Sequence, residues 1–354
     1  LYIYKSYNDI NLHVCYINNI HVNLWVKVGD RMATMKDVAK KAGVGLGTVS
    51  RVINNHPSVK DATRVKVQKA IKELDYSPNI IARNLKVSQS ETIALIIPTI
   101  WHPFFSEFAY YVEENVSKRG FKLVLCNSDK NYQKEVEYLE MLKQNKVAGI
   151  IAITYNDIDN YVSSNLPIVS VDRHFSEDVV YVTSDNYNGG KMAVNKLIEN
   201  GCKKLAFIGT TSTRPTDVKN RKIGFKDECI RQSIEYTIFD EKEPVENLEK
   251  KIENYIDENR DIDGIFAIND FVGLTIIKIL GRKGIKIPED IKIIGYDGVK
   301  MSTEQEFLIS TIRQPVERMA KCAVDSIFDI LENNIENKRR VLPVTYVKGS
   351  TTII

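Results

Sequence analysis

The sequence lacks the patterns that commit a chain to disulfide, metal or membrane chemistry. Its 5 cysteines include no CxxC pair, and its 5 histidines are equally dispersed. Scattered cysteines are typical of reduced thiols in a cytosolic protein, and neither set has the spacing of a metal site. No apolar run approaches the ~20 residues that a transmembrane helix needs. We therefore expect a cytoplasmic protein with no metal, no cofactor and no membrane partner.

Motifs of the common catalytic centres are missing too. The sequence holds no GxSxG nucleophile turn, no GxxxxGK[ST] phosphate loop and no cluster of metal-ligating side chains. With 354 residues, 43% hydrophobic and 27% charged, the chain is typical of a soluble protein with room for a small domain and a larger one. We predict a protein that binds rather than one that catalyses.

The stretch MKDVAKKAGVGLGTVSRVINN, residues 35–55, has the pattern of two short helices joined by a tight turn. Thr34 begins a capping-box pattern, and Gly43 suits the left-handed residue that ends a helix. A second helix is predicted to begin near Leu46. A third, from Asp61 to Leu74, is needed because two helices this short bury little by themselves. This layout is that of a helix-turn-helix.

The charge of this segment argues against the alternative of an ordinary three-helix surface subdomain. Residues 33–86 hold 11 Lys or Arg and 4 Asp or Glu, a net charge of +7. The whole chain is only +3 and residues 1–32 carry +1, so residues 87–354 carry −5. A basic head on an acidic body is typical of a nucleic-acid binder, so we predict that the head binds DNA.

Two segments flank the predicted head. Residues 1–31 lack the basic start, compact apolar run and cleavage site of a secretory signal. Because the chain begins without Met, and Met32 directly precedes the head, we expect these residues to be a poorly ordered, translated upstream region. Beyond the head, a helix beginning at Pro78 is too short to persist alone in water. We predict that residues 78–90 form a hinge helix that folds on binding, followed by a linker.

From Thr92 onward, apolar runs of strand length alternate with amphipathic stretches of helix length. Continuous apolar strands, each followed by a helix, indicate a buried parallel sheet, and the number of units predicts two doubly wound lobes. Ligands bind such folds between the lobes, at the carboxyl ends of strands. The predicted strands are Ile93–Ile97, Leu123–Cys126, Gly149–Ile153, Ile168–Val171, Leu205–Ile208, Gly264–Ala267 and Ile291–Gly295, and the predicted helices are Glu107–Lys118, Lys134–Gln144, Gly189–Glu199, Asn220–Arg231, Leu248–Glu258 and Phe271–Gly281.

A series of motifs follows the head in a fixed order. The hinge SPNIIARNLK leads to IIPTIWHPFFSEF, LPIVSVDRHFS, VTSDNYNGG, FAIND, IPEDIKIIGYDG and STIRQP. Together with the head, these motifs resemble the LacI/GalR family of transcriptional regulators over essentially everything after Met32. The resemblance implies a small all-α helix-turn-helix head, residues 32–77, and an α/β core of two doubly wound lobes, residues 91–354, shaped like a type I periplasmic binding protein. Several motifs look most like repressors of sucrose and related sugar operons.

The resemblance also implies a mode of DNA binding. In the family, two recognition helices of a homodimer read a palindromic operator in successive major grooves, and hinge helices pair in the minor groove. Leu85 would wedge open the central base step there. Bases would be read by Leu46, Gly47 and Arg51, and Arg51 can donate two hydrogen bonds to a guanine, worth ~1–3 kcal/mol of discrimination. The other expected DNA contacts are Lys36, Thr48, Ser50, Asn54, Asn79 and Lys86.

For the effector, the resemblance implies a sugar or sugar phosphate held between the lobes. Carboxylates accept hydrogen bonds from adjacent hydroxyls and a planar guanidinium donates a fork, which suits a sugar. For each Asp alone, capping of a strand end is the competing explanation, and Arg173 has the alternative of pairing with its neighbour Asp172. The expected ligand residues are Phe104, Phe105, Arg173, Asp185, Arg221, Asn269, Asp297 and Gln314.

We therefore predict an allosteric repressor of carbohydrate genes. A ligand in the cleft would change the angle between the lobes and the spacing of the hinge helices, and so the operator affinity. One alternative is a global catabolite regulator driven by a phosphoprotein partner instead of a sugar. A solute-binding protein is a second alternative, which the core fold allows but the basic head opposes.

Overall fold

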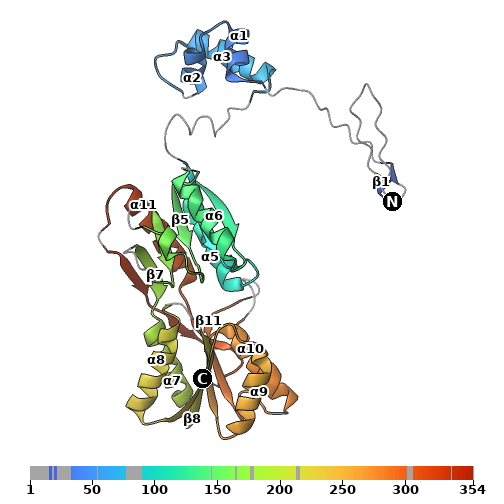
Figure 1. Ribbon diagram of the computed structural model, residues 1–354, viewed down its shortest axis with the longest axis vertical. Helices are drawn as coiled ribbons and strands as arrows, with labels where there is room; N and C mark the ends of the chain where they lie inside the picture. Colours follow the sequence, from blue (N-terminus) through green and yellow to red (C-terminus); the bar gives the residue numbers. More distant parts are fainter. Residues whose placement is uncertain are drawn as a thin grey trace. The chain divides into compact units, whose positions relative to one another are not determined.

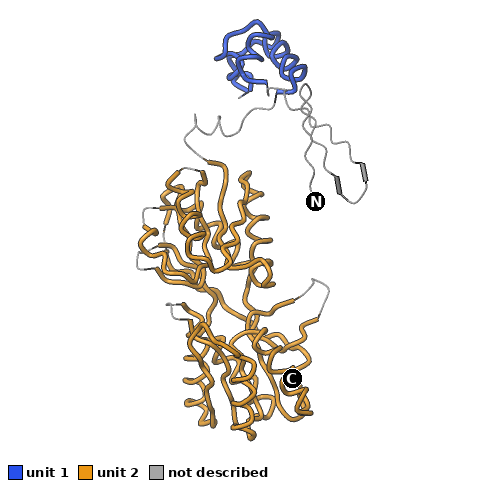
Figure 2. The backbone as a smooth tube through the Cα atoms, turned by 45° about the vertical axis from the view of Figure 1, so that its right-hand side comes forward, with its two compact units in different colours: residues 1–88 blue, residues 89–354 orange. Residues whose placement is uncertain are grey.

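The computed structural model describes residues 16–17, 20–21, 33–53, 55–76, 90–144, 146–163, 166–175, 179–212, 216–300, 306–335 and 337–353. The chain divides into two compact units, residues 1–88 and residues 89–354, coloured separately in Figure 2. Of the N-terminal segment, the description covers only strands β1 (Tyr16–Ile17) and β2 (Ile20–His21), which pair antiparallel. Among the described helices, none is long and apolar enough to cross a membrane.

The first unit contains the three predicted short helices: α1 (Met35–Ala42), α2 (Leu46–Ile53) and α3 (Asp61–Glu73) (Figure 1). The capping box at the start of α1 is confirmed, because the Thr34 hydroxyl accepts from the Asp37 amide while the Asp37 carboxylate accepts from the Thr34 amide. Gly43 ends α1 with a φ of 66°, in the left-handed region that glycine adopts without strain.

A small apolar core holds these three helices together. Each helix contributes residues that are at most 3% exposed, and they are Val38, Val49, Val52, Val67 and Ala70. Because eight-residue helices are marginal alone in water, this shared core is what stabilises α1 and α2. The helix-turn-helix prediction is confirmed.

The first lobe of the second unit is a six-stranded sheet in the order β13-β7-β6-β5-β3-β4, parallel throughout. Helices α5 and α11 pack together on one face and α6 covers the other. Its elements are β3 (Thr92–Ile97), α5 (Pro103–Ser117), β4 (Lys122–Asn127), α6 (Tyr132–Lys143), β5 (Gly149–Ala152), the 3-10 turn η1 (Asp159–Tyr161), β6 (Ile168–Val171), β7 (Val180–Ser184), α11 (Val316–Leu331) and β13 (Arg339–Leu342).

The second lobe repeats this plan with the sheet order β14-β12-β11-β10-β8-β9, in which only β14 runs antiparallel to its neighbour. Helices α7 and α8 cover one face, and α9 and α10 the other (Figure 1). Its elements are α7 (Asn186–Glu199), β8 (Lys204–Thr211), α8 (Lys219–Gln232), β9 (Glu235–Lys242), α9 (Leu248–Glu258), β10 (Gly264–Ala267), α10 (Asp270–Arg282), β11 (Lys292–Asp297), β12 (Ser310–Arg313) and β14 (Thr345–Val347). Two doubly wound lobes are therefore confirmed.

Neither lobe is continuous in sequence, because the chain crosses between them three times. It leaves the first lobe after β7, returns to it between β12 and α11, and leaves again between β13 and β14. The crossings lie at residues 184–186, 313–316 and 342–345. Any change in the angle between the lobes must be absorbed at these three short segments.

Candidate functional site

A cavity of about 280 Å³ lies between the two lobes of the second unit, where the strands of both sheets end. This is the place at which parallel α/β sheets bind ligands. The first lobe lines it with Thr99, His102, Phe104, Phe105, Lys130, Tyr155 and Asp172, and the second lobe with Thr210, Thr211, Ser212, Thr216, Val218, Lys219, Arg221, Glu243, Ile268, Asn269, Asp297 and Gln314.

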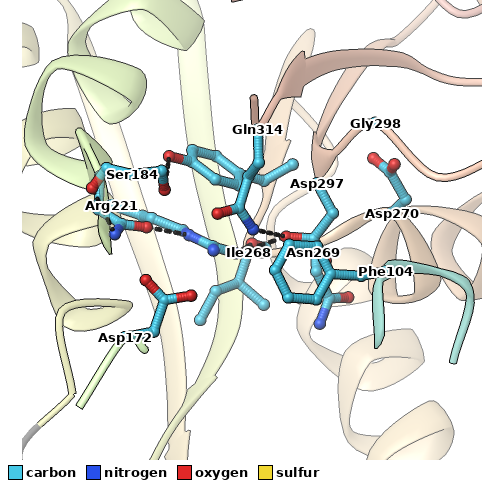
Figure 3. Close-up of polar contacts among 12 residues, drawn as sticks. Phe104, Asp172, Ser184, Arg221, Ile268, Asn269, Asp270, Asp297, Gly298 and Gln314 are labelled. Carbon is cyan, nitrogen blue, oxygen red and sulfur yellow. Dashed lines mark hydrogen bonds and ion pairs between the residues drawn. The ribbon is translucent and has the colours of Figure 1, made fainter. Parts of the chain in front are cut away.

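Arg221, on α8, is the most firmly fixed polar group of the cavity. Its Nε donates to Asn186 Oδ1 at 2.7 Å, and its Nη1 donates to the Ile268 carbonyl at 2.8 Å (Figure 3). The same Nη1 lies 3.3 Å from Asp297 Oδ1, and the guanidinium stacks 3.6 Å from the centre of the Tyr296 ring. With only 3% of its surface exposed, this guanidinium is a preorganised donor.

Asp297 and Gln314 lie next to Arg221 in the cavity wall, at the ends of β11 and β12. Gln314 Nε2 donates to Asp297 Oδ1 at 2.8 Å (Figure 3). Gln314 Oε1 is buried and has no hydrogen-bond partner within the described part of the chain. A buried acceptor left open costs free energy, so a ligand that donates a hydrogen bond there would be favoured. Asn269, which the prediction also included, lines the same wall and caps α10 through Val272.

Aromatic rings close the cavity on the first lobe. Phe104 and Phe105 lie in the first turn of α5 at 5.4 Å, edge to face, so the structure brings both predicted rings to the cleft. His102 caps this helix and lies 4.6 Å from the Phe271 ring of the second lobe. Burial lowers the pKa of His102, so the ring is neutral at neutral pH and adds no charge.

Asp172 is a cavity residue that the sequence prediction missed. It follows β6, and its carboxylate accepts a 2.6 Å hydrogen bond from the Thr183 hydroxyl. Burial raises the pKa of Asp172 to about 6. The sequence signal that could have found Asp172 is its place directly after a buried apolar strand. Lys130, Tyr155 and Glu243 also follow strands and line the cavity.

Two predicted ligand residues, Arg173 and Asp185, lie outside the residues that line the cavity. Arg173 is 1% exposed and donates to Thr154 Oγ1 at 3.0 Å and to Asp159 Oδ1 at 3.1 Å. Because Asp172 has a φ of 56°, the chain turns there, and Arg173 enters the first lobe instead of the cleft. Asp185 directly follows β7 and caps the next helix, α7, by accepting from the Asn188 amide at 3.1 Å, a structural role that differs from the expected capping of a strand end.

The predicted DNA-contacting residues of α2 lie on its exposed side. Leu46 is 45% exposed, Gly47 and Arg51 are exposed, and Thr48 and Ser50 are half-buried, whereas Val49 and Val52 are buried in the core. Lys36 is exposed at the start of α1. The remaining predicted contacts, Asn54, Asn79, Leu85 and Lys86, lie outside the described residues, as does nearly all of the predicted hinge.

Comparisons with known proteins agree with this architecture. The family described as "Bacterial regulatory proteins, lacI family" matches residues 34–79, and the "Periplasmic binding protein-like domain" matches residues 194–352. The chain is 37% identical to the sucrose operon repressor of Streptococcus mutans over 322 residues, which are 90% of this chain and 99% of that protein. It is 34% identical to the ribose operon repressor of Halalkalibacterium halodurans, over 91% of this chain and 97% of that protein.

A solved structure is similar as well. It is the periplasmic binding protein/LacI transcriptional regulator from Alkaliphilus metalliredigens complexed with D-xylulofuranose, with 31% identity and a TM-score of 0.64 over 75% of this chain and all of that one. The three-helix head and the two-lobed core thus occur in one chain, and its relatives match it nearly end to end. The chain belongs to the LacI family of bacterial regulatory proteins and is a DNA-binding transcriptional regulator.

Proposed function

We propose that the protein represses carbohydrate-utilisation genes in the cytoplasm, and that a sugar or sugar phosphate in the interlobe cavity sets its affinity for the operator. The observation that carries this proposal is the pairing of preorganised donors with open acceptors in that cavity. Arg221 is held by three neighbours, while Gln314 Oε1 is buried without a hydrogen-bond partner among the residues that the structure describes. A polyol presents both donors and acceptors at short spacing, so it satisfies both groups at once.

The shape of the cavity supports a sugar in the same way. Phe104 and Phe105 offer an apolar wall, and a sugar ring has apolar C–H faces with hydroxyls at its edge. Asp172 and Asp297 approach from opposite lobes and would accept from those hydroxyls. The relatives are named for the sucrose and ribose operons, and the similar solved structure contains D-xylulofuranose. These names support a small carbohydrate as the ligand class.

Coupling to DNA is part of the proposal. Gln314 follows β12 and lies in the crossing at residues 313–316, and Asp172 lies on the first lobe. One ligand in the cavity would therefore contact both lobes and a segment that connects them. A ligand that prefers one lobe angle shifts the population toward that angle, and operator affinity follows by linkage. On the DNA side, α2 would read bases through Leu46, Gly47 and Arg51.

We infer that the active form is a homodimer on a palindromic operator, with Leu85 of each copy acting in the minor groove. The edge strand β4 of the first lobe supports a self-association surface. Val124 and Leu125 are 38% and 46% exposed there, and Tyr110 on the adjacent α5 is 67% exposed. An exposed apolar sheet edge is a liability in a monomer unless another chain covers it.

A two-part experiment tests the proposal. Thermal unfolding is first measured with sucrose, D-fructose, D-ribose and their phosphates, because a ligand of the folded state raises the midpoint in proportion to its occupancy. The stabilising compound is then titrated into a complex of the protein with promoter DNA from its own gene region. A compound that stabilises the core and also changes DNA affinity supports the proposal. If none of these compounds alters DNA binding, the proposed sugar control is wrong.

A further inference from the structure

We propose that Asp270 and Thr311 are positioning residues that hold Asp297 in its ligand-binding orientation, although neither lines the cavity. The inference rests on the proposed function, in which Asp297 accepts hydrogen bonds from the ligand. It assigns to two buried residues behind the site a role in effector recognition that their position in the sequence does not reveal.

The backbone that carries Asp297 is strained. Asp297 has a φ of 105° and Gly298 a φ of 75°, so two consecutive residues lie at positive φ. Such a conformation is costly for a residue with a side chain and persists only where its surroundings enforce it. Something in the structure must therefore hold the turn that follows β11.

Asp270 and Thr311 make those enforcing contacts. Asp270 Oδ2 accepts from the Val299 amide at 2.7 Å, and Asp270 Oδ1 accepts from the Thr311 hydroxyl at 2.7 Å. The Thr311 oxygen in turn accepts from the Gly298 amide at 3.2 Å. Both amides that follow Asp297 are thus bound by this pair, and the Asp297 carbonyl accepts from the Gln314 amide at 3.2 Å.

The turn is packed closely against its neighbours. A Cβ on Gly295 would lie 2.1 Å from Asp270 Oδ1, and a Cβ on Gly298 would lie 2.4 Å from Arg313 Cγ. Asp270 is 4% exposed and Thr311 is fully buried, so water does not compete for their hydrogen bonds. Figure 3 shows the Asp270 carboxylate on the far side of Asp297 from Arg221, directed toward Gly298.

The simpler explanation is that Asp270 only stabilises its own helix, since an acidic residue in the first turn of α10 favours the helix dipole. Its described hydrogen bonds argue otherwise, because they go to Val299 and to Thr311 on β12, outside that helix. Asp270 also directly follows Asn269, another cavity residue. One carboxylate therefore fixes the relative position of two ligand-facing residues on neighbouring strands.

The test compares Thr311→Val, which removes the hydroxyl, with Thr311→Ser, which retains it. Hydrogen exchange reports the protection of the Gly298 and Val299 amides, and isothermal titration reports the affinity for whichever of sucrose, D-fructose, D-ribose or their phosphates stabilises the wild type most. We expect Thr311→Val to lose protection at both amides and to bind about tenfold more weakly, since hydrogen bonds to a charged group are involved. Thr311→Ser should restore both properties.

Thr351→Val is the matched control. Thr351 is another buried threonine of the same lobe, bonded to Ser310 and Ile293 and not to Asp270, so its loss destabilises the lobe without touching the turn. The proposal is overturned if Thr311→Val leaves amide protection and affinity at wild-type values, or if Thr351→Val reproduces both losses. If no sugar of the panel binds the wild type, the proposed function fails, and the exchange measurement still decides the positioning role.

Discussion

At the scale of single residues, the cleft depends most on Arg221, because its guanidinium joins Asn186, the Ile268 carbonyl and Asp297 in one geometry. Lysine carries the same charge but cannot donate in three fixed directions. We expect Arg221→Lys to weaken effector binding by about tenfold or more, because one or two hydrogen bonds of a buried charged group are lost. Isothermal titration measures this change directly.

Arg231→Lys is the control for that substitution. Arg231 lies on the same helix but at its exposed end, where it pairs with Glu228. The same chemical change there should leave effector affinity at the wild-type value. Equal losses from both variants would show that helix α8, and not the guanidinium of Arg221, determines the affinity.

Two buried carboxyl groups lead to a prediction about how the stability of the core depends on pH. Burial raises the pKa of Asp270 to about 7 and that of Asp172 to about 6, from an ordinary 3.8. Each group binds its proton more tightly in the folded chain than in the unfolded chain. Its contribution to the free energy of unfolding is therefore fully present below pH 3.8 and is lost as the pH rises through the folded pKa. We expect Asp270→Asn to remove its share of this loss, on the order of 4 kcal/mol for a pKa raised from 3.8 to about 7, from urea-unfolding curves of the core measured between pH 4 and 8.

Asp257→Asn provides a control of opposite sign. A hydrogen bond from Lys283 lowers the pKa of Asp257, so this group stabilises above its ordinary pKa and loses that contribution as the pH falls. Asp257→Asn should therefore lower the stability at neutral pH by a constant amount and change the slope of the curve only on the acid side, where the wild type loses this contribution. A wild-type curve without any fall between pH 4 and 7 would contradict the interpretation of the two buried carboxyls.

Prediction of which residues line the cavity agrees with the structure where chain position alone decides it, and their contact with a ligand stays a prediction. Six predicted residues line it, because each ends a strand, directly follows one, or lies in the first turn of the helix that comes after a strand. It failed at the pair Asp172 and Arg173, where a positive φ at Asp172 decides which side chain enters the cleft. A backbone turn of that kind has no signature in the sequence, since neither residue is glycine.

At the scale of elements, two glycines stand at the start of α2: Gly45 directly precedes the helix, and Gly47 is its second residue. Neither has another atom within 4 Å of the place where a Cβ would stand, and neither has a positive φ. We expect Gly47→Ala to stabilise the head by about 0.5 kcal/mol, because alanine loses less conformational freedom in a helix. Thermal unfolding of the full chain, followed at the head transition, measures the shift.

Gly43→Ala is the paired control, because the same methyl group has equal space there but the backbone differs. Gly43 has a φ of 66°, where an L side chain costs about 1–2 kcal/mol, so this variant should be destabilised. If both variants shift the midpoint in the same direction, backbone conformation does not explain the placement of these glycines.

The elements themselves differed in how well the sequence predicted them. Helix α9 and strands β6 and β10 were predicted at their observed bounds, since the apolar residues of α9 recur at helical spacing and both strands are short apolar runs. Strand β9 was missed because it is an edge strand with half-buried, alternating polar residues. Strands β7, β12, β13 and β14 and helix α11 were also missed. Most of these strands have only three or four residues, and short segments give little periodicity to recognise.

At the scale of the whole molecule, the proposed homodimer makes a prediction through Leu125 on the edge strand β4. A lysine there would place a charge in an apolar contact and oppose pairing of two edges. We expect Leu125→Lys to sediment as a monomer and to lose operator affinity steeply, because one head contacts only half of a palindromic site.

Ile230→Lys is a suitable control, since Ile230 is 58% exposed on α8 of the other lobe and is as apolar as Leu125. It should remain a dimer and bind the operator like the wild type. A Leu125→Lys protein that stays dimeric would place the self-association surface elsewhere on the core.

The three crossings between the lobes have a consequence for the order in which this protein can fold as it is synthesised. The first lobe needs α11 and β13, which are made more than a hundred residues after the strands they pack on, and the second needs β14. Before α11 is synthesised, the part of the sheet face that Met319, Val324 and Ile327 cover in the folded protein is exposed to solvent. The helical head can fold from local contacts during translation. The core can complete its fold only near the end of translation. Nascent chains of this regulator therefore acquire a DNA-binding head well before they acquire the cleft that we propose controls it.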